Sequence, residues 1–194
     1  MMGEKTINHK NIYYPPGGIL MWIIIYLELF TFGMALIAMV YYGSEEPLVF
    51  ANSSKLLNPI YGMINTIFLL TSGFFMAVAV KELKNKKKQK AQQYLLVTML
   101  FGILFLGLKS IEYYDKIEAG LNMSYNTFFS FYWMLTLFHV IHVIVGLVIL
   151  ISVYFGIKKE KYNADIEDVE ASATFWHMCD LIWILLFPII YLLF

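Results

Sequence analysis

Arginine is absent from this chain of 194 residues, and all 14 basic residues are lysines. Charged residues make up only 14% of the sequence, against roughly a quarter in an average soluble domain. The single cysteine, Cys179, excludes a disulfide framework within the chain, and there is no CxxC motif. The formal net charge is +0, so the basic excess typical of nucleic-acid-binding proteins is missing, and we predict that nucleic acid is not a partner.

Hydrophobic residues, by contrast, make up 60% of the chain. They gather in five stretches, each close to or above the roughly 20 residues that a helix needs to cross a bilayer. No connecting segment is long enough to hold a soluble core. The sequence therefore predicts an all-α, polytopic membrane helix bundle: a cytoplasmic N-terminal segment, 1–18, and one five-helix transmembrane domain, 19–194. Its predicted spans are about 19–42, 60–80, 94–113, 128–157 and 173–194.

The lysines predict the orientation of this bundle. Six of them lie between Lys81 and Lys90, in the loop after the second stretch, and "KKEK" follows the fourth. Two more precede the first stretch, whereas the two remaining loops carry one lysine each, Lys55 and Lys116. Lysine-rich loops stay on the cytoplasmic side, so we predict a cytoplasmic N-terminus and a periplasmic C-terminus.

Ionisable residues inside these stretches are candidates for function, because charge in hydrocarbon is costly. Glu28 lies near the middle of the first stretch. Its residue type suits either a proton-related or lipid-facing site, or a protonated carboxyl group bonded to a neighbouring helix, and both interpretations stay open. Lys109 and Glu112 are three residues apart near the end of the third stretch, which predicts an ion pair on one helix face.

Histidine, the commonest metal ligand, is scarce. The chain has four histidines. His139 and His142 are three residues apart on one helix face in "LTLFHVIHVIVGL", but a metal site needs further ligands from elsewhere. Besides these two, His177 with Asp180 offers a second pair at the same spacing, suited to binding a lipid headgroup or another helix. We predict no metal ligand and no catalytic residue in the chain.

Small and weakly polar residues in the second and third stretches allow membrane helices to approach closely. We predict that they are packing positions: Thr66, Thr71, Ser72, Gly73, Gly102 and Gly107.

Several segments, taken in order, resemble the cytochrome c oxidase subunit III family of the haem-copper oxidases. "MWIIIYLELFTFG" resembles the helix that carries the family's membrane glutamate, here Glu28. "INTIFLLTSGFFMAVAV" resembles the next helix, and "GILFLGLKSIEYYDKI" the one after, with Glu112 at the Glu-Tyr position. "FYWMLTLFHVIHVIVGL" resembles the double-histidine helix, and "FWHMCDLIWILLFPIIYL" the terminal Trp-His-x-x-Asp-x-x-Trp signature.

The resemblance is to the short form of the family, which has five helices instead of seven. The residues of the terminal signature resemble those of a branch of the family that is associated with bacterial nitric oxide reductases. One departure concerns the double-histidine helix, where the family often has a glycine two residues before each histidine. Leu137 and Val140 occupy those positions here, which leaves open how closely another helix approaches that face.

The resemblance implies a subunit without a redox centre of its own. It would be a multi-pass protein of a bacterial inner membrane that stabilises the catalytic subunit I, binds phospholipid and supports proton uptake. Subunit I would hold haem with copper or non-haem iron. The chain itself would bind no cofactor; its partners would be subunit I and the other subunits of the complex. The resemblance assigns lipid contact, helix contact or proton-related roles to Glu28, Glu112, His139, His142, His177 and Asp180.

Other functions fit the same residues. Within the family, the chain could assist assembly without staying bound. A small proton-coupled transporter could use Glu28 and the histidines as a proton path, although we find no repeat between the two halves of the chain. A di-haem membrane cytochrome could use the histidines as axial ligands.

Overall fold

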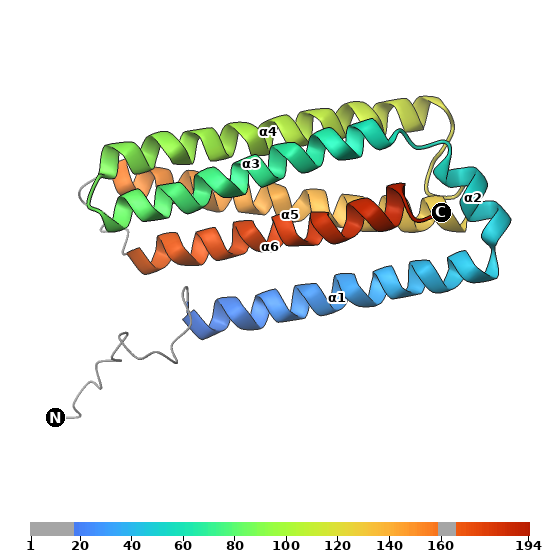
Figure 1. The fold of residues 1–194 in the computed structure, drawn as a ribbon, viewed down its shortest axis with the longest axis horizontal. Coiled ribbons are helices and arrows are strands. Elements are labelled where there is room, and N and C mark those ends of the chain that lie inside the picture. Colours follow the sequence, from blue (N-terminus) through green and yellow to red (C-terminus); the bar gives the residue numbers. More distant parts are fainter. Residues whose placement is uncertain (1–17, 159–165) are drawn as a thin grey trace.

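The computed structural model describes residues 18–158 and 166–194, and it is built from helices (Figure 1). The predicted cytoplasmic segment 1–18 therefore lies, except for Gly18, outside the described residues. The six helices of the described part are α1 (Gly18–Glu45), α2 (Pro47–Ser54), α3 (Pro59–Lys84), α4 (Lys88–Glu118), α5 (Thr127–Lys158) and α6 (Ile166–Tyr191).

Five of these helices are long and apolar enough to cross a membrane, which confirms the predicted class and number of spans. They contain 26 to 32 residues, more than the roughly 20 that a bilayer requires, so their ends can project beyond the hydrocarbon. Consecutive long helices run in opposite directions (Figure 1). The sixth helix, α2, was not predicted; at 8 residues it is too short to span and instead connects α1 to α3.

Local sequence signals explain where the helices start and turn. Pro47 and Pro59 stand at the first positions of α2 and α3, where their missing N–H groups cost no hydrogen bond. The Asn58 side chain accepts a hydrogen bond from the Ile60 backbone N–H at 3.0 Å and so caps α3. Between α3 and α4, Lys86 adopts a positive φ of 60° and reverses the chain.

Helices α6 and α1 differ sharply in how they are packed. Thirteen of the 26 residues of α6 are buried, and it contacts α1, α3 and α5. Only five of the 28 residues of α1 are buried, and Figure 1 shows α1 running along the side of a bundle formed by α3, α4, α5 and α6. The core therefore lies around α6, and α1 is a peripheral helix.

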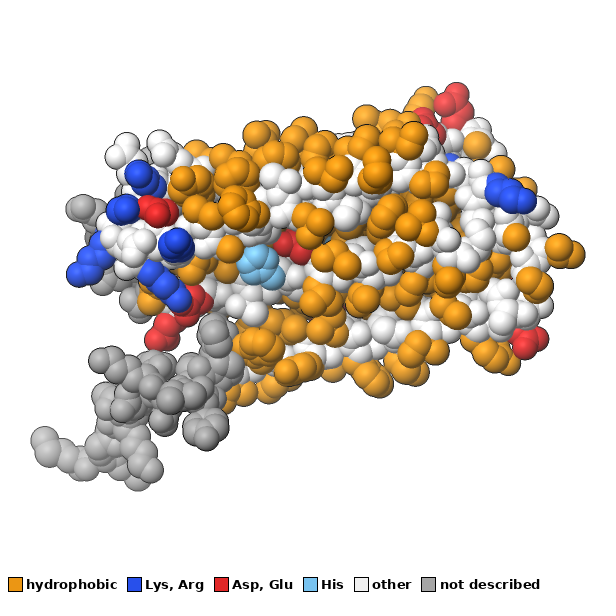
Figure 2. All heavy atoms as spheres, viewed as in Figure 1, with side chains coloured by type: hydrophobic (Ala, Val, Ile, Leu, Met, Phe, Trp, Pro, Cys, Tyr) orange, Lys and Arg blue, Asp and Glu red, His pale blue; other side chains and the backbone are white. Residues whose placement is uncertain are grey.

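The surface has the distribution expected of a membrane bundle. Hydrophobic side chains cover the middle of the face shown in Figure 2, and basic side chains gather at one end of it. The lysine run between Lys81 and Lys90 lies at that end, in the turn between α3 and α4 and in the helix ends beside it.

Candidate functional site

The peripheral helix α1 is joined to α5 by a polar pair at membrane depth. The Glu28 Oε2 atom lies 3.2 Å from His142 Nε2, and the two side chains are 19% and 12% exposed. Two aromatic rings flank the imidazole, with centroids 5.7 Å (Phe32) and 4.6 Å (Phe138) from its own. The pair thus lies at a seam between two helices, partly open toward the membrane.

The geometry of this pair implies a shared proton. His142 Nδ1 is 2.8 Å from the Phe138 carbonyl oxygen, and because a carbonyl only accepts, Nδ1 carries a proton. Nε2 would then present a lone pair to the Glu28 carboxylate, and two acceptors at 3.2 Å repel each other. The contact with Glu28 is favourable when one more proton resides either on Oε2 or on Nε2.

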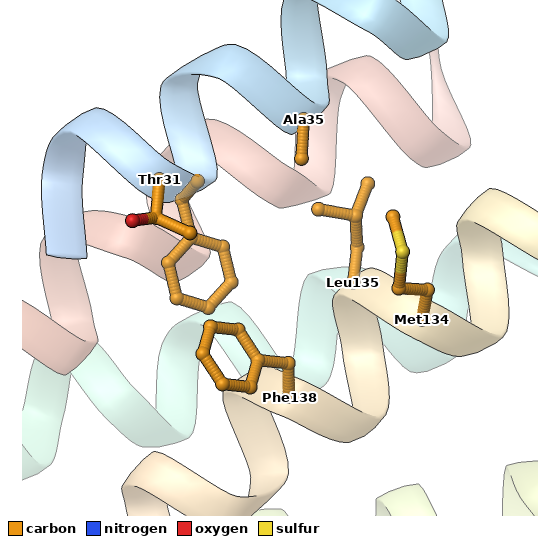
Figure 3. Close-up of a pocket in the computed structure, with 6 residues that line it drawn as sticks. Thr31, Ala35, Met134, Leu135 and Phe138 are labelled. Carbon is orange, nitrogen blue, oxygen red and sulfur yellow. The ribbon is translucent and has the colours of Figure 1, made fainter.

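An apolar hollow of about 260 Å³ lies beside the pair, between α1 and α5. Phe32 and Phe138 line it and stack on each other at 5.1 Å, so the same two rings contact both the hollow and the imidazole. Figure 3 shows Thr31 and Ala35 facing Met134 and Leu135 across the space. The Thr31 hydroxyl donates to the Leu27 carbonyl of its own helix at 2.9 Å. The hollow therefore suits a hydrocarbon chain.

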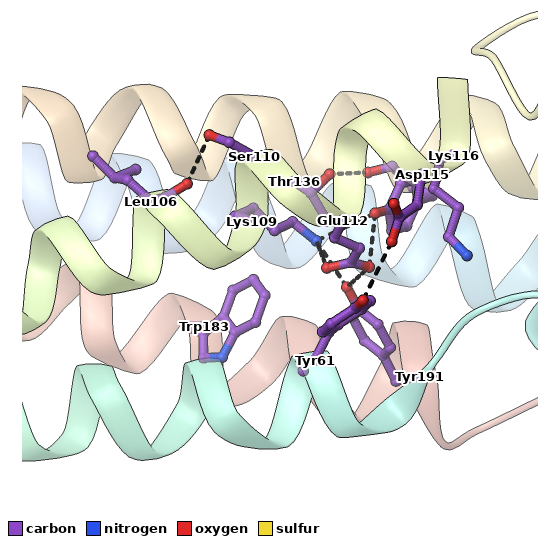
Figure 4. Close-up of polar contacts among 12 residues, drawn as sticks. Tyr61, Leu106, Lys109, Ser110, Glu112, Asp115, Lys116, Thr136, Trp183 and Tyr191 are labelled. Carbon is purple, nitrogen blue, oxygen red and sulfur yellow. Dashed lines mark hydrogen bonds and ion pairs between the residues drawn. The ribbon is translucent and has the colours of Figure 1, made fainter. Parts of the chain in front are cut away.

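A second polar cluster lies in the core, on α4, and includes the ion pair predicted from spacing. Lys109 Nζ is 3.0 Å from Glu112 Oε2, and the two side chains are 1% and 0% exposed. The ammonium group also donates to the hydroxyl oxygens of Tyr191 at 2.7 Å and Tyr132 at 3.3 Å. Both of these hydroxyls donate in turn to Glu112 Oε1, at 2.6 Å and 2.9 Å. Figure 4 shows Lys109, Glu112 and Tyr191 of this cluster.

This core cluster is saturated. The three N–H donors of the ammonium group all have acceptors, and the carboxylate accepts three hydrogen bonds. Sequence spacing identified Lys109 and Glu112 but missed Tyr132 and Tyr191, because these come from α5 and α6. The cluster joins three helices through hydrogen bonds among its own members, which favours a structural role.

The two histidines of the double-histidine helix lie in different environments, although their spacing placed them on one helix face. His139 is fully buried, with Trp183 stacked at 5.3 Å and Phe105 edge-on at 5.6 Å. Neither of its ring nitrogens has a hydrogen-bond partner. His142 instead faces Glu28. A spacing of three residues turns a helix by about 300°, so the two side chains point about 60° apart around the helix axis. Here that angle directs His139 into the core and His142 toward the α1 seam.

The two positions at which this chain departs from the family's glycines are not in the buried core of α5. The Leu137 residue is 39% exposed and Val140 is half-buried.

The predicted terminal signature joins α6 to α3. The indole N–H groups of Trp176 and Trp183 donate to Ser72 Oγ and Thr66 Oγ1, both at 3.0 Å. Ser72 Oγ in turn donates to the Thr98 carbonyl of α4 at 2.8 Å. Ser72 and Thr66, predicted as packing positions, therefore accept hydrogen bonds from the two tryptophans of the signature.

The remaining two residues of the signature form the third polar site. His177 Nδ1 lies 3.4 Å from Asp180 Oδ2, at the edge of a hollow between α3 and α6. Cys179 is a free, buried thiol on the same helix. Within residues 18–158 and 166–194, no three His, Cys, Asp or Glu side chains come together as metal ligands.

The family model of cytochrome c oxidase subunit III matches residues 12–193, nearly the whole chain. The chain belongs to the cytochrome c oxidase subunit III family. Its five apolar helices and this membership make it a multi-pass membrane protein and relate it to subunit III of the haem-copper oxidases.

Curated relatives carry the same family name. The chain is 30% identical over 141 residues to cytochrome bo(3) ubiquinol oxidase subunit 3 of Buchnera aphidicola, covering 72% of this chain and 69% of that protein. It is 30% identical to cytochrome c oxidase subunit 3 of Synechocystis over 98% of this chain and 81% of the relative. A probable subunit 3 from Rickettsia conorii is 32% identical, but the match spans 46% of its length. Several family members are thus considerably longer than this chain.

The six residues singled out from the sequence occupy three separate sites in this subunit III family member. Glu28 and His142 form the α1 seam, Glu112 belongs to the core cluster with His139 packed nearby against Trp183, and His177 and Asp180 form the α3–α6 site. Their assignment to lipid contact, helix contact or proton-related roles remains a prediction.

Proposed function

We propose that this chain is a non-catalytic subunit that stays bound beside the haem-bearing catalytic subunit of a respiratory complex. The support is membership of the subunit III family, whose relatives from Buchnera and Rickettsia are bacterial. We place it in a bacterial inner membrane. Eleven lysines in the loops of one side and two in those of the other support a cytoplasmic N-terminus.

The Glu28–His142 pair is the observation that carries the function within the complex. A proton held between a carboxyl group and an imidazole at membrane depth is unusual, because ionisable groups there are costly and mark proton or ion paths. The two side chains are partly exposed while Oε2 itself is buried, so in this proposal the proton exchanges with groups outside the chain when the carboxyl group rotates. We assign it a supporting role in proton uptake by the catalytic subunit.

The apolar hollow next to the pair supports phospholipid binding. The hollow has a volume of about 260 Å³, and its apolar lining from α1 and α5 suits a hydrocarbon chain. An acyl chain there would contact the rings of Phe32 and Phe138 (Figure 3). An acyl chain in this place would also limit access of water to the imidazole. Lipid binding and proton supply would then act on the same seam.

The redox centres belong, in this proposal, to the partner subunit: haem with copper or with non-haem iron. The three histidines of the described residues are a poor fit for an axial pair. His139 is enclosed between Phe105 and Trp183, and His142 and His177 each face a carboxylate. Ligation of a haem by His139 would require these aromatic rings to move apart.

The direct test is sustained turnover of the purified complex carrying Glu28→Gln. We expect normal insertion and copurification but activity that declines over many turnovers, because the amide cannot hold the shared proton. Ser44→Ala is the matched control, since Ser44 is exposed on α1, lies outside the hollow, and donates to the Tyr41 carbonyl of its own helix at 2.6 Å. Turnover equal to that of Ser44→Ala throughout would reject the proton-related role.

The electron acceptor requires a separate measurement. The named relatives are subunits of oxidases, whereas the terminal signature resembles the branch associated with nitric oxide reductases. Both oxygen and nitric oxide consumption should be measured on the complex that copurifies with this chain. Haem analysis of the same preparation identifies the catalytic partner.

The alternatives predict different results with the isolated chain. A di-haem cytochrome would show a Soret band that follows this polypeptide alone. A proton-coupled transporter would move solute into liposomes, and Glu28→Gln would abolish that transport. An assembly factor would support formation of the complex and be absent from the purified product.

A further inference from the structure

A largely apolar hollow that contains His177 and Asp180 opens on the flank between α3 and α6, away from the α1 seam. It has a volume of about 350 Å³, with Gly73 and Phe74 on one side and His177, Asp180, Leu181 and Ile184 on the other. On the face shown in Figure 2, a histidine and an acidic side chain lie together among hydrophobic ones. A hollow of this kind is unexpected on a surface that would otherwise contact lipid.

The Asp180 carboxylate is held in the hollow with one oxygen unused. Its side chain is 9% exposed, Oδ2 lies 3.4 Å from His177 Nδ1, and Oδ1 is buried without a hydrogen-bond partner. Gly73 makes this position possible, because a Cβ atom there would overlap Oδ2. A buried acceptor without a donor is costly, typically by about 1–3 kcal/mol. The site therefore lacks a donor.

No cation from the described helices supplies that donor. Lys84, at the end of α3, is paired with Glu170 at 2.6 Å, and Lys109 is saturated within the core cluster. His177 is the only charged or chargeable side chain found against the carboxylate among the residues that the structure describes. The hollow thus favours a hydrogen-bond donor or a cation over a phosphate.

The depth of the site argues for a protein donor. The predicted span begins at residue 173, so His177 lies four residues, or about 6 Å, inside it and Asp180 about 10 Å inside it. Lipid headgroups lie at the edge of a hydrocarbon layer about 30 Å thick, so they would have to sink to reach Asp180. Ionisable side chains at such depth almost always face protein or water, yet the His177 side chain is 44% exposed in this chain.

We propose that this hollow is where a transmembrane helix of another subunit docks, presenting a cationic or hydroxyl side chain to the exposed His177 ring and the Asp180 carboxylate beside it. Phe74, Leu181 and Ile184 form the exposed apolar rim that packs against that helix, at 64%, 45% and 45% exposure. The inference rests on the proposed function, since it requires a complex, and it adds which face of the chain makes the contact and through which chemistry.

Photo-crosslinking in the purified complex tests the inference with Asp180 intact. A crosslinking amino acid replaces Phe74 in one variant and Leu181 in another, and adducts are identified by mass spectrometry. We expect both positions to link to one membrane helix of a copurified subunit, close to a Lys, Arg, Ser, Thr or Tyr of that helix. Adducts with lipid or a quinol alone at both positions would overturn the inference, while copurification would still uphold the proposed function.

The carboxylate itself is tested with Asp180→Asn, which keeps its shape. The fraction of this chain retained on the complex is measured during detergent titration. We expect the ratio of bound to free chain to fall roughly tenfold, which is the effect of losing one charge-assisted hydrogen bond. Ser110→Ala is the control, because Ser110 is exposed on α4 and donates only to the Leu106 carbonyl of its own helix, at 2.7 Å. Equal retention of the two variants would overturn the role of Asp180.

Discussion

The two ion pairs at membrane depth, Lys109–Glu112 and Glu28–His142, have opposite surroundings. The first is almost fully enclosed, and two tyrosine hydroxyls complete its hydrogen bonds. The second lies at a seam, with the Glu28 and His142 side chains 19% and 12% exposed and 3.2 Å between Oε2 and Nε2. In the proposed function, the enclosed pair stabilises the bundle and the pair at its edge exchanges a proton.

The same contrast separates their helices. Lys109 and Glu112 are joined to α6, half of whose residues are buried, whereas Glu28 lies on α1, which buries five of 28. Stability therefore depends mainly on the core around α6, and mobility in the membrane is expected first in α1.

The largest effect should come from breaking the core pair. Lys109→Met leaves the Glu112 carboxylate buried and uncompensated, and we expect the free energy of unfolding to fall by about 3–5 kcal/mol. Denaturant unfolding of the purified chain in detergent measures this change. The double variant Lys109→Met/Glu112→Gln removes both charges and should recover part of the loss. A double variant no more stable than the single one would contradict the electrostatic explanation.

An intermediate effect should distinguish the inner and outer faces of α4. A Cβ atom at Gly102 would lie 2.8 Å from the Trp176 ring, whereas nothing lies within 4 Å of one at Gly107. We expect Gly102→Ala to destabilise the chain by about 1–3 kcal/mol through overpacking. Gly107→Ala should be neutral or stabilising by up to about 1 kcal/mol, from helix propensity. Thermal unfolding of the two variants side by side checks the difference, and equal melting temperatures would show that the core at Trp176 can relax.

The smallest effect should come from the seam. Glu28→Gln weakens one interhelical contact, worth about 1 kcal/mol in a membrane bundle. Because that contact holds a peripheral helix, we expect amide hydrogen exchange to rise about fivefold in α1 and to stay unchanged in α6. Exchange mass spectrometry in nanodiscs reads the two helices separately. An equal rise in both helices would show that α1 unfolds together with the core.

Much of the fold could be predicted from hydrophobicity alone. The five spans follow from apolar length, because a helix must cover the hydrocarbon with its own hydrogen bonds. The Lys109–Glu112 pair followed from a spacing of three, since residues three apart lie on neighbouring faces of one helix. Helix α2 was missed because an eight-residue connecting helix carries no span-length signal.

The partners of the site residues could not be predicted in this way. Tyr132 and Tyr191 complete the core cluster from α5 and α6, and His142 rather than His139 meets Glu28. The signature of α6 likewise acquires its meaning from Ser72 and Thr66 on α3.

The sequence by itself determined that this is a five-span member of the subunit III family. It also determined which ionisable residues lie at membrane depth and which residues are neighbours along each helix. Only the tertiary structure decided which of those residues meet, leaving the Asp180 carboxylate with an unused oxygen at the α3–α6 flank. The physical reason is that helical periodicity relates residues three and four apart, while a contact between helices depends on the rotation and depth of each helix, which packing of the whole bundle sets.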